Sequence, residues 1–418
     1  MMIQETIERP EPAALDGPLA GLRVIELATF VAGPLGGMTL AQLGADVIRV
    51  DPIGGAADTR RLPVSASGKS LYWTALNKGK RSVMLDVRSG RGQELVVELL
   101  RRSGPAGGIL LTNSGGRGWL SYQALRRQRN DLIQLSILGR RDGGTAVDYT
   151  VNAASGFPFV TGPEDHALPV NHTLPAWDLL CGLYASVGLL AADRWRQMTG
   201  EGREIRLALE DVALASAGNL GLLTEAQVHN VERDRYGNFV YGVFGKDFAT
   251  RDGRRVMLVA LTSRHWEELL RLTGLTEVVT GLERQMDVSF TEDASRFRYR
   301  EVIVGLLKPW FEDRTLAEVE AALSPTSLLW SRYRSFLEIV DEGRSELEGN
   351  PMMRLVDQPG VGRFLAPGSP LAFGGFCGPV RPAPELGQHT DEVLGDLLDL
   401  SGKDLAELRG EGVLGDPG

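Results

Sequence analysis

The chain has 418 residues, of which 43% are hydrophobic and 24% charged, so it can bury a large core and its length predicts two to three domains. Its net charge of -9 argues against a nucleic-acid partner. Two cysteines, Cys181 and Cys377, are too few for a disulfide framework or a cysteine–histidine metal site, so we expect no metal and a cytoplasmic protein.

The first segment, residues 1–17, is a polar leader without the basic and apolar regions of a signal peptide. Apolar runs further along fall short of the roughly 18 residues that span a bilayer, so we expect a soluble protein with no membrane partner. Residues 21–27 then alternate like a strand, 33–38 form a glycine turn, 38–43 a short helix and 45–51 a second strand. This order predicts a βαβ unit and a parallel sheet.

A second unit of the same kind follows, with helices at 91–100 and 119–129 and strands at 108–112 and 131–136. Asp51 stands near the place of a ribose-binding acid, but the glycines at 33, 36 and 37 do not match the dinucleotide fingerprint. We therefore favour a Rossmann-like topology with another ligand over a nicotinamide enzyme.

Two basic loops flanked by glycine, 77–81 and 139–144, contain the residue types that bind phosphate groups. The second loop follows a strand end, where open α/β sheets bind ligands. Neither loop matches a P-loop, and charge exposed to solvent explains each loop equally well.

The next element is a long apolar run, Leu179 to Ala192, opened by Pro175 and closed by Gly200, which predicts a mostly buried helix. Asp178 falls in its first turn, where unpaired backbone N–H groups and the helix dipole favour an ionised carboxylate. The local pattern allows two interpretations, a structural cap and a carboxylate nucleophile that forms a covalent acyl intermediate.

The remaining chain predicts a strand at 203–209, a helix at 210–228 and a hairpin at 246–259. Helical segments at 266–272, 299–311 and 316–323 complete a smaller inserted domain of about 236–340. A stretch rich in glycine and proline begins at 350 and leads to short helices at 391–400 and 404–409, with Thr390 and Ser401 as N-caps.

Several motifs together resemble the family III CoA-transferases, which include formyl-CoA and carnitine CoA-transferases and methylacyl-CoA racemases. They lie at 21–34, 43–51, 77–82, 177–178, 199–202 and 386–394, and the likeness spans roughly residues 18–415. The resemblance implies an α/β fold: a Rossmann-like large domain with a parallel sheet built from both chain ends, a small α+β domain and an interlocked homodimer. We place the large domain at 18–228, the linker and small domain at 229–345, and the C-terminal return at 346–418.

The resemblance also implies roles for individual residues. The nucleophilic aspartate falls on Asp178, and the acyl-CoA is the substrate, so no separate cofactor is expected. The implied CoA contacts are Val31, Ala32, Asn77, Lys78, Lys80, Asn113, Leu138, Arg140 and Arg141. Leu138 stands where formyl-CoA transferases carry a lysine, and Arg140 or Arg141 can substitute for it. For a free substrate carboxylate we expect Arg60 or His172.

Within the family, a further set of stretches resembles the enzymes that move CoA between the C1 and C4 carboxyls of mesaconyl-CoA. These stretches are 32–46, 51–55, 118–122, 139–144, 147–152 and 170–178. An intermolecular transfer to another dicarboxylate is the alternative. Racemases use a histidine and a glutamate where this chain has Val147 and Thr262. Because neither residue can exchange a proton, racemisation is not expected.

Overall fold

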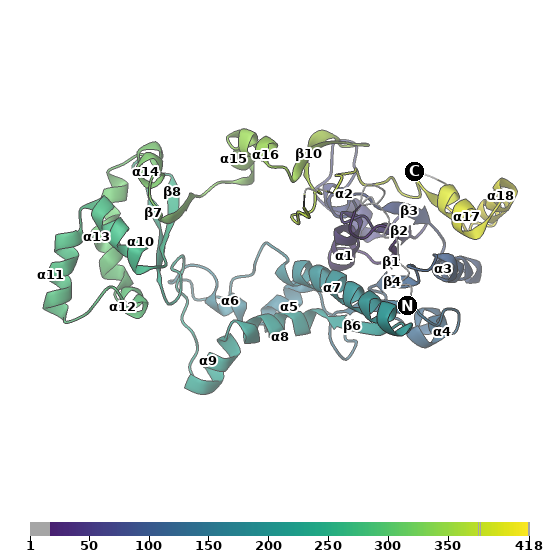
Figure 1. Ribbon diagram of the computed structural model, residues 1–418, viewed down its shortest axis with the longest axis horizontal. Coiled ribbons are helices and arrows are strands. Elements are labelled where there is room, and N and C mark those ends of the chain that lie inside the picture. The colour runs from purple at the N-terminus through teal and green to yellow at the C-terminus, as the bar shows by residue number, and fades with distance from the viewer. Residues whose placement is uncertain (1–16, 375, 377, 417–418) are drawn as a thin grey trace, which may run out of the picture. The chain divides into compact units, whose positions relative to one another are not determined.

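The computed structural model describes residues 17–374, 376 and 378–416, and the chain folds into two compact units (Figure 1). The larger unit comprises the chain up to Ser155, His172–Leu222 and Ser345 onwards, and the smaller unit comprises Gly156–Asn171 and Leu223–Arg344. The sequence placed 156–171 in the large domain, whereas the structure assigns this segment to the smaller unit. The expected leader, 1–17, lies outside the described residues except for Gly17.

The larger unit contains a six-stranded sheet in the order β3-β2-β1-β4-β5-β6. Every neighbouring pair in this sheet is parallel. The strands are β1 (Arg23–Leu27), β2 (Asp46–Asp51), β3 (Arg81–Met84), β4 (Ile109–Thr112), β5 (Ile133–Leu138) and β6 (Glu204–Ala208). The strand order reverses between β1 and β4, which is where open α/β sheets bind ligands. The Rossmann-like α/β prediction is confirmed, and within this sheet the strand that the sequence did not predict is β3.

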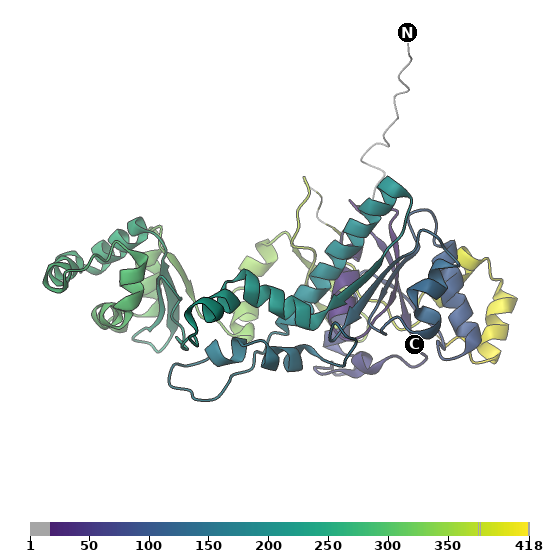
Figure 2. The same ribbon diagram turned by 90° about the horizontal axis from the view of Figure 1, so that it is seen from below.

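Helices cover both faces of this sheet, α1 and α7 on one side and α3 and α17 on the other (Figure 2). The helices and 3-10 turns of the first part of the larger unit are α1 (Ala32–Ala41), η2 (Ala57–Arg60), α2 (Leu71–Leu76), α3 (Gly90–Arg102), η3 (Gly118–Leu120) and α4 (Tyr122–Arg126). Those that follow are α5 (Asp148–Ala154), α7 (Ala176–Thr199), α8 (Leu209–Asn219), α16 (Arg344–Gly349, which begins at the boundary), α17 (Thr390–Leu398) and α18 (Gly402–Gly410).

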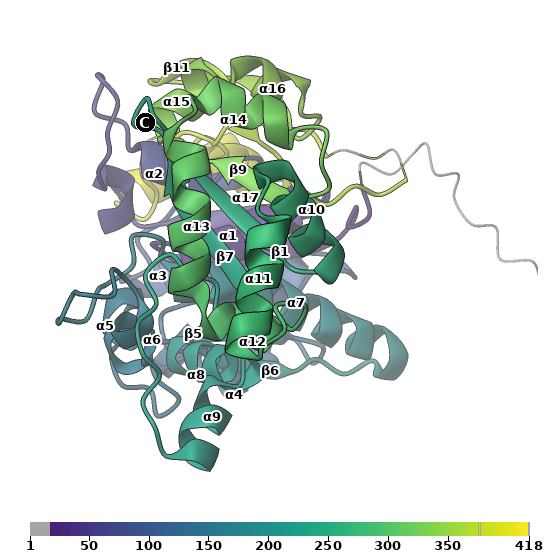
Figure 3. The ribbon, with the colours of Figure 1, turned by 90° about the vertical axis from the view of Figure 1, so that its left-hand side faces the viewer.

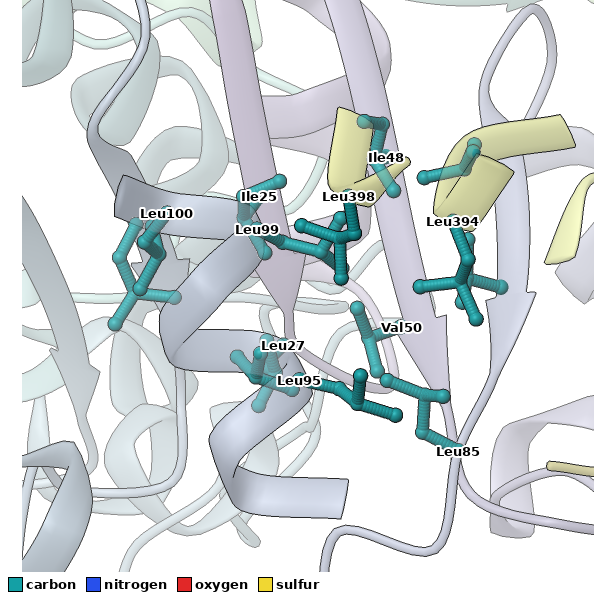
Figure 4. Close-up of a cluster of buried hydrophobic side chains, with 14 of the residues drawn as sticks. Ile25, Leu27, Ile48, Val50, Leu85, Leu95, Leu99, Leu100, Leu394 and Leu398 are labelled. Carbon is teal, nitrogen blue, oxygen red and sulfur yellow. The ribbon is translucent and has the colours of Figure 1, made fainter. Parts of the chain in front are cut away.

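The face under α3 and α17 carries the main apolar core of this unit (Figure 4). Ile25 and Ile48 from the sheet meet Leu95 and Leu99 from α3 and Leu394 from α17, and all five are fully buried or nearly so. Side chains alternate along a strand, so Glu26, next to Ile25, faces α1 on the opposite side. Helix α17, near the C-terminal end of the chain, therefore completes a core that the N-terminal strands begin.

Helix α1 begins at Ala32 and contains the whole glycine segment, 33–38, that the sequence predicted as a turn. The glycines serve close packing instead. A Cβ on Gly33 would lie 2.3 Å from the Ala28 Cβ, and one on Gly37 would lie 1.8 Å from Glu26 Oε2. The turn prediction was wrong because glycine also marks places where two backbones approach closely.

Helix α7 has 24 residues and ends at Gly200, which has a φ of 75°. By length and composition alone it could cross a membrane, which corrects the expectation based on the shorter apolar run. It packs against α1 and β5, and Cys181, Ala185 and Leu189 on its inner face are buried. The helix therefore forms part of the core of the larger unit.

The smaller unit contains an antiparallel sheet in the order β7-β8-β9, with helices packed on it (Figure 3). Its strands are β7 (Phe244–Ala249), β8 (Arg255–Ala260) and β9 (Leu329–Arg332). Its helices are α6 (Phe157–Val160), α9 (Leu222–His229, which begins at the boundary), α10 (Ser263–Thr273), α11 (Thr276–Met286), α12 (Asp293–Arg298), α13 (Arg300–Glu312), α14 (Leu316–Leu323) and α15 (Phe336–Asp341). The unit has a core of its own, centred on Phe244, Phe290 and Phe311.

The segment rich in glycine and proline contains an antiparallel hairpin that the sequence did not predict, β10 (Met353–Gln358) and β11 (Gly362–Pro367). The N-cap of α17 is His389 rather than Thr390, because the Thr390 hydroxyl donates to the Gly387 carbonyl instead. Ser401 caps α18, as expected, through a capping box with Asp404.

Candidate active site

Asp178 lies in the first turn of α7 and is partly buried. The N-cap residue, Pro175, contributes no side-chain hydrogen bond to the helix. The cap comes from Asp148, at the start of α5: its Oδ2 accepts hydrogen bonds from the backbone N–H of Trp177 (2.8 Å) and of Asp178 (3.0 Å). Because Asp148 caps the helix, the carboxyl of Asp178 is not needed for that task, and the structural-cap interpretation loses its basis.

Asp148 is itself buried and held in place. His172 Nε2 donates to its Oδ1 at 2.7 Å, so each carboxylate oxygen has a donor. The His172 ring packs against the rings of Trp177 and Tyr149, with centroids 6.1 and 6.0 Å apart. His172 was predicted to contact a substrate carboxylate, and in the structure its Nε2 binds the Asp148 carboxylate instead of standing free.

Burial and the neighbouring Asp148 carboxylate raise the pKa of Asp178 to about 6, and the positive charge of Arg61 partly opposes this rise. At neutral pH the group is still mostly ionised, as a nucleophilic carboxylate has to be. Its raised pKa also indicates a more basic oxygen than that of an ordinary aspartate. Burial also raises the pKa of the Cys181 thiol to about 12, which keeps it protonated.

The C-terminal ends of β1 and β4 meet beside α1. Asn113, after β4, accepts a hydrogen bond from Thr29 N–H (3.3 Å) and donates one to the Thr29 carbonyl (3.0 Å). Val31 is the N-cap of α1 and Ala32 its first residue. The structure therefore brings together Val31, Ala32 and Asn113, three of the residues that the resemblance assigned to CoA, at the switch point of the sheet.

Helix α1 approaches the site end of α7 closely. A Cβ on Gly182 would lie 2.8 Å from the Ala32 carbonyl oxygen, and one on Gly36 would lie 3.0 Å from the Gly182 carbonyl oxygen. The Ser186 hydroxyl donates to the Gly36 carbonyl at 3.1 Å. Gly182 is one helical turn from Asp178, so these contacts place the start of α1 about one turn of α7 away from Asp178.

A buried charge network supports the loop before α1. The Arg49 guanidinium binds Asp51 Oδ1 (2.9 Å) and Asp58 Oδ2 (3.1 Å), and it lies 3.5 Å from Glu26 Oε1. Asp58 Oδ2 also accepts the N–H of Phe30 at 2.9 Å. Phe30 is a non-glycine residue with a φ of 67°, so the network stabilises a strained backbone position beside the site.

Two expected CoA contacts belong to this network. The fully buried Lys80 ammonium binds both Glu26 carboxylate oxygens, each at 2.8 Å, and the Pro34 carbonyl. Asn77 Oδ1 accepts from Lys80 at 2.9 Å and from Arg49 at 3.0 Å. The side chains of Asn77 and Lys80 are therefore held within this network, because buried ions require partners. The predicted CoA contact of these two residues is left to their backbone.

Lys78, unlike Asn77 and Lys80, is not part of the buried charge network. It lines an apolar cavity of 390 Å³ between α2 and the β10–β11 hairpin, and burial lowers its pKa to about 8. Among the described residues it forms no ion pair. It remains a predicted CoA contact.

The remaining expected residues are Leu138, Arg140, Arg141 and Arg60. Arg140 is exposed, and Arg141 pairs with Asp211 at 2.8 Å, while Leu138 ends β5 half-buried. Arg60 is exposed, with one long hydrogen bond to the Gly54 carbonyl at 3.4 Å. The arginine whose positive charge lowers the pKa of Asp178 is the next residue, Arg61. The sequence analysis missed Arg61 and Asp148, and for Arg61 the adjacent arginines were the only signal.

We expect the initial rate of CoA transfer to rise with pH through an inflection near 6, because only ionised Asp178 attacks a carbonyl. Asp148→Asn removes one of the two causes of the raised pKa, so the inflection moves to lower pH. The pH profile of kcat/KM measures the inflection in the native enzyme and in the Asp148→Asn variant. Asp193→Asn, on the same helix, serves as the control and keeps the original inflection. An unchanged inflection in Asp148→Asn would contradict this electrostatic account.

Comparison with known proteins identifies the family of this chain. The sequence profile of CoA-transferase family III matches residues 19–390. The chain is 49% identical over 405 residues to 2-methylfumaryl-CoA isomerase of Chloroflexus aurantiacus, an alignment that covers 96% of this chain and 99% of that protein. The chain belongs to CoA-transferase family III. It is therefore an enzyme, and the resemblance drawn from its motifs is confirmed.

Two further known proteins are similar to this chain at lower identity. Succinate–glutarate CoA-transferase of Agrobacterium fabrum is 28% identical over 398 residues, which are 91% of this chain and 96% of that protein. A CaiB/BaiF family protein from Brucella suis has a similar fold, with a TM-score of 0.75 and 24% identity over 91% of this chain and 99% of that one.

Proposed function

We propose that this protein moves CoA between the C1 and C4 carboxyls of mesaconyl-CoA (2-methylfumaryl-CoA). The observation that carries the proposal is the 49% identity, over nearly the full length of both chains, to a protein named 2-methylfumaryl-CoA isomerase. The carboxyl of Asp178, with its raised pKa at the head of α7, supplies the nucleophile that the reaction needs.

The first half-reaction transfers CoA to the enzyme. An oxygen of the Asp178 carboxylate attacks the thioester carbonyl, the C–S bond breaks, and CoA leaves as a thiolate, which gives a mixed anhydride between mesaconate and Asp178. The thiolate then attacks the Asp178 carbonyl carbon. The products are an aspartyl-CoA thioester and free mesaconate, which leaves the anhydride as a carboxylate.

The second half-reaction runs the same steps from the other end of mesaconate. Its second carboxylate attacks the aspartyl thioester and expels the thiolate, which then attacks the acyl carbonyl of the new anhydride and restores Asp178. No proton or electron is gained or lost in the cycle. Holding the diacid makes this half unimolecular, and effective molarities of such steps reach about 10⁵ M or more.

For CoA itself we propose the contacts that the resemblance implies and the geometry leaves available. These are the backbone at Val31 and Ala32, with Asn113 beside them, then Lys78, and the loop after Leu138 with Arg140 and Arg141. The start of α1 suits this role because its first N–H groups have no partner within the helix. CoA enters as part of the substrate, and the enzyme needs no other cofactor.

We also propose a homodimer, interlocked as the resemblance implies, in the cytoplasm. Helix α7 exposes a row of apolar side chains, and apolar surface of this kind marks interfaces. The row comprises Leu180, Leu183, Tyr184, Val187 and Met198. Sedimentation equilibrium of the purified chain should give twice the monomer mass.

Intermolecular transfer to another dicarboxylate is the second candidate. The chain is also 26% identical to the β subunit of succinyl-CoA–L-malate CoA-transferase of Chloroflexus aurantiacus, whose name states transfer between two acids. The two candidates differ in whether the free acid leaves the enzyme.

An exchange assay tests the proposal. The enzyme is incubated with unlabelled mesaconyl-C1-CoA and labelled free mesaconate, and the C1 and C4 isomers and the label in each are followed by chromatography. We expect isomerisation with almost no label in the CoA esters. Efficient entry of label defeats the intramolecular reaction, and absence of isomerisation defeats the proposed function as a whole.

Chemical trapping tests the intermediate. Borohydride reduces an aspartyl thioester to the alcohol, and hydroxylamine converts it to a hydroxamate. Peptide mass spectrometry should find either change at Asp178 after incubation with mesaconyl-CoA and in no sample without it. Modification at another acid would assign the nucleophile elsewhere.

A further inference from the structure

Arg61 stands on an aromatic platform close to the nucleophile. Its Cζ lies 4.3 Å from the centroid of the Tyr72 ring and 6.0 Å from that of Phe30. Its backbone is fixed as well: its N–H donates to the Asp58 carbonyl at 3.2 Å, and its carbonyl accepts from the Ser70 hydroxyl at 2.6 Å. Ser70 is the N-cap of α2, which carries Tyr72.

The guanidinium of Arg61 has no hydrogen-bond or ion-pair partner among the described residues. This sets it apart from Arg49, whose donors are used within the buried network. A guanidinium that rests on an aromatic face keeps its in-plane N–H donors at the edge, where they can bind a carboxylate in a bidentate manner. The half-buried Arg61 is therefore preorganised for an anion.

The location of Arg61 also fits the reaction. Phe30 precedes α1, whose first turn packs against α7 one turn beyond Asp178. The charge of Arg61 opposes the rise in the pKa of both Asp178 and Tyr72, and the charge of Asp178 contributes to the rise in the pKa of Tyr72, so the three groups share one electrostatic environment.

We propose that Arg61 binds the free carboxylate of the dicarboxylic acyl group and holds the displaced diacid beside Asp178 between the two half-reactions. This inference rests on the proposed function. Both ends of mesaconate are carboxylates, so one cation can hold either end. The diacid reverses its orientation by exchanging its two carboxylates between Arg61 and the reacting carbonyl, without leaving the enzyme. Arg61 thus replaces Arg60 and His172 as the residue for the distal carboxylate.

A comparison of two substrates tests the contact in the native enzyme. In 2-methylbut-2-enoyl-CoA, a methyl group replaces the free carboxylate of mesaconyl-C1-CoA, while the thioester and the double bond are the same. Single-turnover kinetics, read as acid released and CoA bound to Asp178, give kcat/KM of the first half-reaction. We expect the native enzyme to prefer mesaconyl-CoA by about 10- to 100-fold, the range for a hydrogen bond to a charged group.

Arg61→Met should reduce this preference to about threefold or less, and it should also let labelled free mesaconate enter the CoA esters. Arg61→Lys keeps the charge without the planar fork and should be intermediate. Arg60→Met, at the adjacent exposed arginine, should behave like the native enzyme. Circular dichroism and thermal melting show whether each variant is folded.

The outcomes separate the two proposals. If the native enzyme does not prefer mesaconyl-CoA over 2-methylbut-2-enoyl-CoA, the proposed role of Arg61 is overturned. This result needs no variant. If the folded Arg61→Met variant keeps the full preference, the role of Arg61 is overturned as well. In either case, isomerisation of mesaconyl-CoA by the native enzyme still supports the proposed function. If the native enzyme neither isomerises mesaconyl-CoA nor forms an adduct at Asp178, the proposed function itself has failed.

Discussion

Asp178→Asn should abolish CoA transfer and at the same time stabilise the fold at neutral and alkaline pH. The carboxamide cannot form the aspartyl anhydride, so we expect turnover to fall by about 10⁴-fold or more. Initial rates of isomerisation and the loss of the trapped adduct measure this effect.

The gain in stability follows from the raised pKa. In the folded protein the pKa of Asp178 is about 6, above its ordinary value of 3.8, so the folded state binds the proton more tightly than the unfolded chain. The contribution of this group is complete below pH 4 and is lost as the pH rises through 6. An uncharged side chain avoids that loss, and because Asp178 is partly exposed we expect a gain of about 1–2 kcal/mol at pH 8.

Urea denaturation at pH 8 and pH 4 tests this linkage. The advantage of Asp178→Asn should appear at pH 8 and vanish at pH 4. Asp193→Asn is the matched control, because Asp193 lies on the same helix and pairs with Arg196 at 2.6 Å. That variant should lose stability and keep its activity. If the Asp178→Asn enzyme still turned over substrate, the nucleophile would have to be another group.

Arg49→Met should destabilise the larger unit by about 3–5 kcal/mol, the cost of breaking a buried ion pair by removing one partner. The substitution leaves Glu26, Asp51 and Asp58 buried with Lys80 as the one remaining cation of the network. The change in the midpoint of denaturant unfolding, followed by circular dichroism, measures the loss.

The control for this prediction is Arg91→Met. Arg91 pairs with Glu94 at 3.0 Å on the exposed face of α3, and its side chain is 54% exposed. Such surface pairs contribute about 0–1 kcal/mol, so this variant should unfold close to the native midpoint. If both variants lost the same free energy of unfolding, burial would not be the reason why the Arg49 network stabilises the protein.

Local patterns in the sequence were sufficient for much of the architecture. Alternating apolar residues at 21–27 and 45–51 indicated parallel strands, and the hairpin predicted at 246–259 matches the pairing of β7 with β8. The same patterns failed at β10 and β11, because a polar, partly exposed hairpin has little hydrophobic periodicity. They failed at the start of α1 because glycine there permits close packing instead of a turn.

The candidate site also has features that the sequence predicted and features that it did not. The sequence by itself determined that Asp178 lies at the head of an apolar helix, because Pro175, the apolar run and Gly200 are local signals. Only the tertiary structure decided what surrounds that carboxyl. Asp148 caps the helix, Arg61 rather than Arg60 is the nearby cation, and Lys80 is a buried partner of Glu26. Burial and charge pairing depend on distances between residues far apart in the chain, and neither composition nor periodicity contains those distances.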